Sequence, residues 1–307
     1  MRARTARAAS LIALTFAALV WNRSALAQSV YVESSPSGGG GQFGVLNLLS
    51  GAYQNIGTTA VSLTGLALST GGTLYATDAA NVLYIVNPAT GQTTARGSLG
   101  FAGSQITSIA YASDSQLYGL LSAASGAASL VRINPSGTPS AVSVGSLTFQ
   151  SDGALAGGAS GNLYATEGNL PAFGSGSLYR TTTAGGAAQS LSPGGDAGYD
   201  SAPVFALSFA GGALFAIDNG TGGQTGDVGT IYAVTTDTGV ATPVSTYSAS
   251  VVGNVSAATT ATVPESATTV LLLPAFVVGA VVARRRLFSL TPLIPLSHRN
   301  ERGGLGG

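Results

Sequence analysis

The stretch that decides the fold is residues 63–99, which read LTGLALSTGGTLYATDAANVLYIVNPATGQTTARGSL. A short apolar run at 63–69 is followed by the aliphatic–aromatic pair Leu74-Tyr75. Alternating apolar residues then lead into Asn87-Pro88-Ala89-Thr90-Gly91, and a Thr-rich run follows at 92–99. Asparagine, proline and glycine together are typical of a tight turn between antiparallel strands. The stretch therefore predicts four consecutive strands.

The same order recurs along the chain at a period of 43 to 52 residues. The aliphatic–aromatic pairs are Val30-Tyr31, Leu74-Tyr75, Leu117-Tyr118, Leu163-Tyr164 and Leu214-Phe215. The runs that end in a glycine turn are 43–51, 82–91, 130–137, 178–185 and 231–239. The preceding strands, rich in small residues, are 63–69, 106–112, 153–158 and 204–209. Four strands per unit predict an all-β fold, a β-propeller with small residues on its crowded inner strands.

The number of units predicts how the ring closes. The first unit lacks an inner strand, whereas 251–258 is left over after the last complete unit. Pairing of these two ends closes the ring at five blades and removes exposed sheet edges. An irregular β-sandwich or solenoid is the alternative. The regular place of the aromatic residues predicts packing between blades rather than a sugar-stacking platform.

The N-terminus has the pattern of a secretory signal peptide, a basic start followed by the apolar run 8–20 and small residues at a cleavage position. The basic and small residues are Arg2, Arg4, Arg7, Ala25 and Ala27. We expect cleavage before Gln28, which makes 1–27 the signal peptide and 28–262 the exported body. An uncleaved membrane helix is the alternative, but this run is shorter than the roughly 20 residues needed to span a bilayer.

The C-terminus carries Val263-Pro264-Glu265-Ser266, then the uncharged apolar run 267–283, then Arg284-Arg285-Arg286. As a helix the apolar run is about 25 Å long, which predicts a transmembrane segment with flanking arginines that snorkel. Cytoplasmic loops favour arginine, so the body is expected outside the inner membrane. A buried core helix is the alternative.

This order of tag, helix and arginines resembles the PEP-CTERM sorting signal of exported proteins in Gram-negative bacteria that make exopolysaccharide. The resemblance covers about the last 45 residues and implies recognition and cleavage by an exosortase, a membrane-embedded cysteine peptidase. Two features depart from the family pattern. Ser266 replaces its second proline, and 287–307 continue beyond the arginines as a disordered tail or the product of a misplaced stop codon. The expected partners are an exosortase, the membrane, and exopolysaccharide or envelope proteins.

The net charge of zero conceals an acidic body. Within 28–262 there are three arginines, Arg96, Arg132 and Arg180, against ten acidic residues, a net charge near −7, and the chain contains no lysine. An acidic surface repels phosphate backbones, which argues against nucleic-acid binding. Cations and neutral glycans are more compatible partners.

Most catalytic constellations are excluded by residue type. The single histidine, His298, lies in the tail, and the chain has no cysteine. The body therefore has no Ser-His-Asp triad, histidine metal site, thiolate or Schiff-base nucleophile. Only pairs of carboxylates remain for acid–base chemistry.

Three acidic residues, Asp78, Glu167 and Asp218, each stand four residues after the aliphatic member of their pair, which places them where second strands end, on one face of the disc. Expected loops on that face hold Asp196, Asp200 and Asp227. Carboxylates beside glycine-rich loops suit Ca²⁺, with Asp218 and Asp227 as candidate ligands, although no spacing matches a known calcium loop. The alternative is that these acids are solvated turn residues.

We therefore expect an exported, non-enzymatic propeller that serves the cell envelope or exopolysaccharide matrix by interaction, without a required cofactor. One alternative is a carboxylate-dependent glycan hydrolase or lyase, which needs two of these acids roughly 5 to 10 Å apart in a cleft. Another is a purely structural surface protein.

Overall fold

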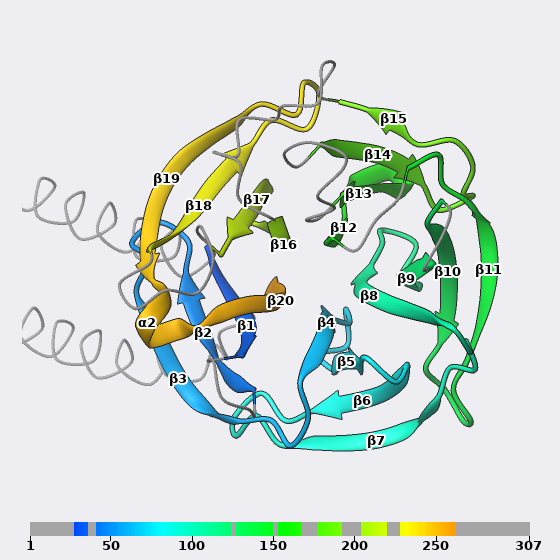
Figure 1. Ribbon diagram of the computed structural model, residues 1–307, viewed down its shortest axis with the longest axis horizontal. Helices are drawn as coiled ribbons and strands as arrows, with labels where there is room; N and C mark the ends of the chain where they lie inside the picture. Colours follow the sequence, from blue (N-terminus) through cyan, green and yellow to red (C-terminus); the bar gives the residue numbers. More distant parts are fainter. Residues whose placement is uncertain are drawn as a thin grey trace, which may run out of the picture. The chain divides into compact units, whose positions relative to one another are not determined.

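The computed structural model describes residues 28–35, 41–123, 127–149, 153–167, 177–191, 204–219 and 228–261. Within these ranges five four-stranded antiparallel sheets stand as blades around a centre (Figure 1). The inner strand of each blade contacts the inner strands of both neighbouring blades, so the ring is closed. The predicted all-β, five-bladed propeller is confirmed.

Within each blade the strands follow one another from the centre of the ring outward. Blade 1 holds β20 (Asn254–Thr260), β1 (Ser29–Ser35), β2 (Gln42–Asn47) and β3 (Tyr53–Thr58). Blade 2 holds β4 (Leu63–Leu68), β5 (Leu74–Asp78), β6 (Val82–Val86) and β7 (Thr93–Ser98). Blade 3 holds β8 (Ser104–Tyr111), β9 (Leu117–Ala123), β10 (Ser129–Asn134) and β11 (Ser140–Ser146). Blade 4 holds β12 (Leu155–Gly157), β13 (Asn162–Thr166), β14 (Leu178–Thr182) and β15 (Gln189–Ser190), with the 3-10 turn η1 (Ala159–Gly161). Blade 5 holds β16 (Val204–Ala210), β17 (Ala213–Asp218), β18 (Val228–Val234) and β19 (Ala241–Ser248).

Both ends of the body meet in blade 1, as predicted. The last strand, β20, pairs with β1 in a register that sets Thr260 opposite Val30, and Figure 1 shows the two strands side by side. The closing strand begins later than expected. Residues 249–252 form the short helix α2 (Ala249–Val252), which ends at Gly253, and Gly253 has a φ of 80° that favours glycine.

The hydrophobic core is divided among the joints between blades. In the described residues five clusters of buried side chains lie one to each joint. Of the repeated aromatics, Tyr31, Tyr118, Tyr164 and Phe215 each belong to a different cluster, and the partly buried Tyr75 packs against the fifth. Their predicted role in packing between blades is confirmed.

Small residues on the inner strands allow the blades to approach closely. A methyl group at Gly157 of β12 would overlap the carbonyl oxygen of Tyr111 on β8.

The turn between β6 and β7 is the predicted one. Gly91 has a φ of 74° and donates its N–H to the carbonyl of Asn87 at 2.8 Å.

The predicted terminal segments lie outside the described residues. They are the signal peptide (1–27), the tag and helix (263–286) and the tail (287–307). Among the residues that the structure does describe, no helix is long and apolar enough to cross a membrane.

Candidate functional site

The strand-exit face is the side of the disc on which the second strand of each blade ends and the inner strand of each blade begins. Antiparallel pairing brings these ends together. Asp78 and Asp218 end β5 and β17, and Glu167 directly follows β13, so the predicted placement of all three is confirmed. Asp196, Asp200 and Asp227 lie outside the described residues.

Asp78 is held by its own blade. Its Oδ1 accepts hydrogen bonds from the N–H groups of Ala80 at 3.0 Å and Val82 at 2.9 Å, and its Oδ2 accepts one from the hydroxyl of Tyr84 at 2.9 Å. Burial, and then the adjacent Asp78 carboxylate, raise the pKa of Tyr84 to about 12. The phenol therefore stays protonated and acts as a hydrogen-bond donor.

Asp218 is held in the same way but is enclosed. Only 2% of its surface is exposed, which contradicts the alternative of a solvated turn residue for this position. Its Oδ1 accepts from the N–H of Thr230 at 3.3 Å, and its Oδ2 from the hydroxyl of Tyr232 at 3.1 Å. A carboxylate in this position is not exposed to a ligand in solution.

Glu167 repeats the arrangement in blade 4, where its Oε1 accepts a 2.7 Å hydrogen bond from the hydroxyl of Tyr179. Burial and the Glu167 carboxylate raise the pKa of Tyr179 to about 12. The acid–tyrosine pair at this position of the repeat thus occurs in blades 2, 4 and 5.

The pair follows a rule of register. Each tyrosine lies opposite an alanine two residues after the aliphatic member of the repeat: Ala76, Ala165 and Ala216. Blades 1 and 3 have Gly44 and Val131 at the tyrosine position and Ser34 and Leu121 at the acid position. Acid and tyrosine are therefore present together or absent together, which is a signal in the sequence that motif-by-motif inspection missed.

Glu33 is the acid whose environment was least expected from the sequence. Its side chain is fully buried, and it accepts hydrogen bonds from the N–H of Leu63 at 3.2 Å and from the hydroxyl of Ser256. Burial raises the pKa of Glu33 to about 7, although the hydrogen bonds from Ser256, Leu63 and Thr59 partly oppose this shift. The side chain joins β1 to the beginning of β4 in the next blade.

The contact from Glu33 is one of a set that we call the blade latches. In each, a polar side chain of one blade binds backbone near the beginning of the next blade's inner strand. Across the described residues all five joints have one: Glu33 with Leu63, Asn81 with Ile106, Ser108 with Leu155, Thr166 with Val204, and Asn219 with Val255. Sequence reasoning missed these residues because a single polar side chain beside a strand has no distinctive pattern.

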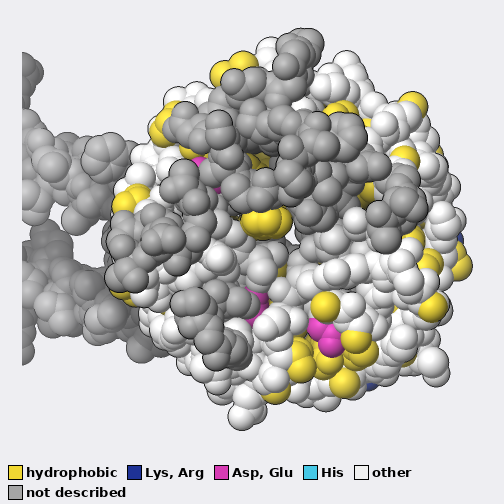
Figure 2. All heavy atoms as spheres, in the orientation of Figure 1, with side chains coloured by type: hydrophobic (Ala, Val, Ile, Leu, Met, Phe, Trp, Pro, Cys, Tyr) yellow, Lys and Arg dark blue, Asp and Glu magenta, His cyan; other side chains and the backbone are white. Residues whose placement is uncertain are grey.

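The strand-exit face does not gather its described acids into a metal site. Within the described ranges no group of three or more acidic or histidine side chains is placed to hold a metal ion. The magenta acidic side chains visible in Figure 2 are scattered over this face, and dark blue arginine atoms appear only at its rim. The described acids Asp78, Glu167 and Asp218 accept hydrogen bonds within the propeller, and Asp227, the second candidate calcium ligand, lies outside the described residues.

Comparisons with known proteins found distant likeness among solved structures. No protein-family model matches the chain, and no curated protein matches its sequence. The PQQ-bound aldose sugar dehydrogenase of Streptomyces coelicolor is 22% identical, with a TM-score of 0.40 over 64% of this chain and 70% of that one. A gluconolactonase of Xanthomonas campestris is 13% identical, with a TM-score of 0.42 over 66% and 71%. The calcium-binding protein regucalcin of Agrobacterium tumefaciens is 12% identical, with a TM-score of 0.42 over 71% and 74%. Likeness at this level carries no argument about the function of this chain.

Proposed function

We propose that the chain is an exported cell-envelope protein whose propeller is a non-catalytic interaction domain, delivered by its C-terminal sorting signal to the exopolysaccharide matrix. The observation that supports the non-catalytic part is the engagement of the strand-exit carboxylates. Both oxygens of Asp78 and of Asp218 accept hydrogen bonds from their own blades. A general acid or nucleophile needs a carboxyl group that can reach its substrate.

Delivery is proposed from the sequence pattern at the two ends of the chain. The test expresses the full chain in an exopolysaccharide-producing Gram-negative host with an exosortase, and in the same host with that gene deleted. The intact mass of the exported protein should lack Arg284 to Gly307 only where the exosortase is present. A variant with Pro264→Ala and Glu265→Ala should keep the tail in both hosts, and a tail retained in every case would refute the sorting signal.

Incubation of the purified protein with the exopolysaccharide of its host distinguishes an interaction domain from an enzyme. We expect the protein to sediment with the polysaccharide while the polymer keeps its length and releases no new reducing or unsaturated ends. Release of such ends would establish the hydrolase or lyase alternative, which would have to draw on acids such as Asp196, Asp200 or Asp227. If the protein neither binds nor cleaves the polymer, the remaining interpretation is a purely structural surface protein.

A further inference from the structure

A cavity of about 310 Å³ lies in blade 4, where β14 and β15 separate. Two residue pairs join these strands, Tyr179 with Ser190 and Arg180 with Gln189, whereas the corresponding strands of the other four blades share at least five pairs. The chain then leaves the ladder through a loop that includes Gly185 and Ala187, both of which line the cavity.

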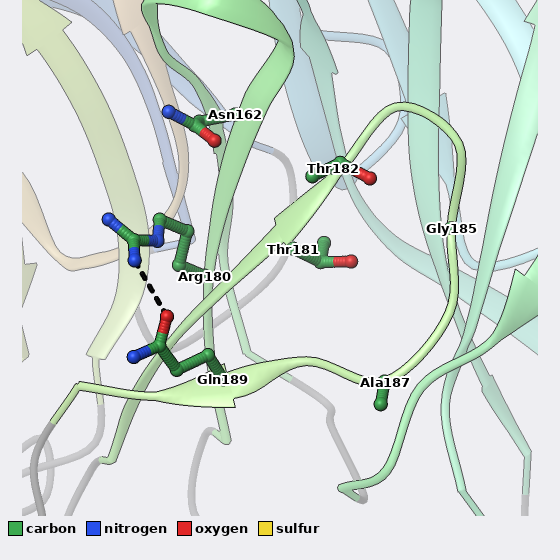
Figure 3. A pocket seen from close by; sticks show the side chains of 7 residues that line it. All are labelled: Asn162, Arg180, Thr181, Thr182, Gly185, Ala187 and Gln189. Atoms are coloured by element: carbon green, nitrogen blue, oxygen red, sulfur yellow. Dashed lines mark hydrogen bonds between the residues drawn. The ribbon is translucent and has the colours of Figure 1, made fainter.

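Three nitrogen-bearing side chains lie on one side of β14 at this cavity: Asn162, Arg180 and Gln189 (Figure 3). The register explains why. Arg180 pairs with Gln189, and Asn162 pairs with Thr182, which is two residues from Arg180 and so on the same face of the strand. The Nη2 of Arg180 donates a 2.6 Å hydrogen bond to Oε1 of Gln189, a neutral partner, rather than to a carboxylate.

On the other side of β14, Thr181 also lines the cavity (Figure 3). Its side chain is 4% exposed, and its hydroxyl oxygen has no hydrogen-bond partner. Buried hydroxyls are nearly always paired, so this one requires an explanation. Because this oxygen has almost no accessible surface, a ligand group would have to enter the gap between β14 and β15 to supply the missing partner.

The lining specifies the chemistry of that ligand. A guanidinium matches a planar carboxylate with two parallel hydrogen bonds. One arginine suits a single negative charge, and the net charge of the body, near −7, repels a polymer with many charges, so the ligand should carry few carboxylates. The lining contains no aromatic ring, so the cavity is not built to stack a neutral sugar. Its volume is at the lower end of small-molecule sites, about 300 to 1,000 Å³.

We propose that this cavity binds a single uronate unit of an otherwise neutral polysaccharide, with the sugar carboxylate on Arg180 and sugar hydroxyls on Asn162, Gln189 and Thr181. The inference rests on the proposed function and deepens it, because it names a polysaccharide with occasional uronate units as the matrix component that the propeller recognises.

The test titrates the full chain, purified in detergent, with a neutral oligosaccharide that carries one glucuronate unit, and calorimetry measures the binding. The control ligand is the same oligosaccharide with its carboxyl group reduced to an alcohol. We expect Arg180→Gln to weaken glucuronate binding at least about tenfold, and the reduced ligand to bind the unaltered protein at least about tenfold more weakly. The matched control is Arg96→Gln, which removes the same charge from blade 2, where Arg96 contacts the carbonyl of Gly137 at 3.3 Å.

A second variant separates ligand binding from folding. Thr181→Val removes the unpaired hydroxyl without changing the shape of the side chain, so it should weaken binding while the melting temperature stays level or rises. Absence of glucuronate binding, equal binding of the reduced ligand, or equal loss in Arg96→Gln would overturn the inference. Should Arg180→Gln fail to fold, Arg180→Lys, which keeps the charge but loses the paired donors, takes its place with the same expected loss. If one of these results overturns the inference but the protein still binds a neutral polysaccharide matrix, the proposed function remains supported.

Discussion

The hydroxyl of Tyr232 donates a 3.1 Å hydrogen bond to Oδ2 of Asp218, and the protein encloses both side chains, with 0% and 2% of their surfaces exposed. This pair occupies the position at which a ligand-binding carboxylate was a reasonable expectation. Because a buried carboxylate is costly without donors, the tyrosine makes the acid tolerable in the core. The pair therefore belongs to the architecture of blade 5.

Removal of the Tyr232 hydroxyl should destabilise the propeller. Tyr232→Phe takes one donor from an enclosed carboxylate, and we expect the free energy of unfolding to fall by roughly 1 to 3 kcal/mol. Denaturant unfolding measures this. Tyr84→Phe is the matched control, since its partner Asp78 is half-buried and can take a water molecule instead, so its loss should be smaller. Equal losses in the two variants would contradict the importance of burial.

Removal of the Asn219 latch should loosen the closure of the ring. Asn219 exchanges hydrogen bonds with the backbone of Val255 at 2.7 and 3.0 Å and accepts another from Tyr247 at 3.1 Å. Asn219→Ala should lower the free energy of unfolding by about 2 to 3 kcal/mol. Hydrogen exchange should accelerate first in β20 and β1. The exposed turn variant Ser136→Ala should leave these strands unchanged, and uniform acceleration across all blades would contradict a local latch.

Stability should fall as pH rises through the range set by Glu33. A glutamate titrates near 4.5 in the unfolded chain, whereas burial raises the pKa of Glu33 to about 7 in the fold. Below the lower value both states hold the proton. Between the two values the unfolded chain releases it first, so the fold loses up to about 3 kcal/mol by the time the pH exceeds the folded pKa.

Glu33→Gln removes this titration and isolates its effect from that of other acids. The difference in unfolding free energy between variant and unaltered protein should grow in the variant's favour from about pH 4.5 to about pH 8. The measurement is a series of denaturant titrations across that range. A difference that stays constant with pH would show that Glu33 does not titrate there.

Close approach of blades 3 and 4 should make Gly157 intolerant of a side chain. Gly157→Ala forces a methyl group against the backbone carbonyl of Tyr111, and overpacking of this kind costs about 1 to 3 kcal/mol. Gly71→Ala is the control, because the nearest atom to a methyl group there is the hydroxyl of Ser69 at 3.9 Å. A comparable change in melting temperature for the two variants would argue against the tight inner ring.

Calcium should have little effect on the described part of the strand-exit face, since the oxygens of Asp218 already accept hydrogen bonds. We expect the melting temperature of the full chain to be the same in calcium and in chelator. A rise in calcium that Asp227→Asn abolishes would instead establish a site built on the loop between β17 and β18.

The fold was predictable from particular residues. The pairs from Val30-Tyr31 to Leu214-Phe215 recur because every blade must fill the same joint, and a repeated packing problem leaves a repeated sequence solution. Closure was predictable because one strand was missing at the start and one was left over at the end. The position of Asp78, Glu167 and Asp218 on one face followed from the same period.

The environment of those acids was not predictable from position alone. Whether a carboxylate at the end of a strand faces water or a tyrosine depends on the neighbouring strand and its register, and the tyrosine lies 6 residues away for Asp78 but 14 for Asp218. Glu33 is a sharper case, because its partners Leu63 and Ser256 are 30 and 223 residues distant.

The strands, turns and repeats of this chain follow from short-range patterns of consecutive residues. The two terminal segments proposed to direct export are recognised from patterns of the same kind. Burial and hydrogen-bond partnership are properties of the closed ring, because they arise where blades from distant parts of the chain meet. For that reason the amino-acid sequence alone predicted a five-bladed propeller. The tertiary structure alone decided that its described strand-exit acids support the fold and that Arg180 borders a cavity.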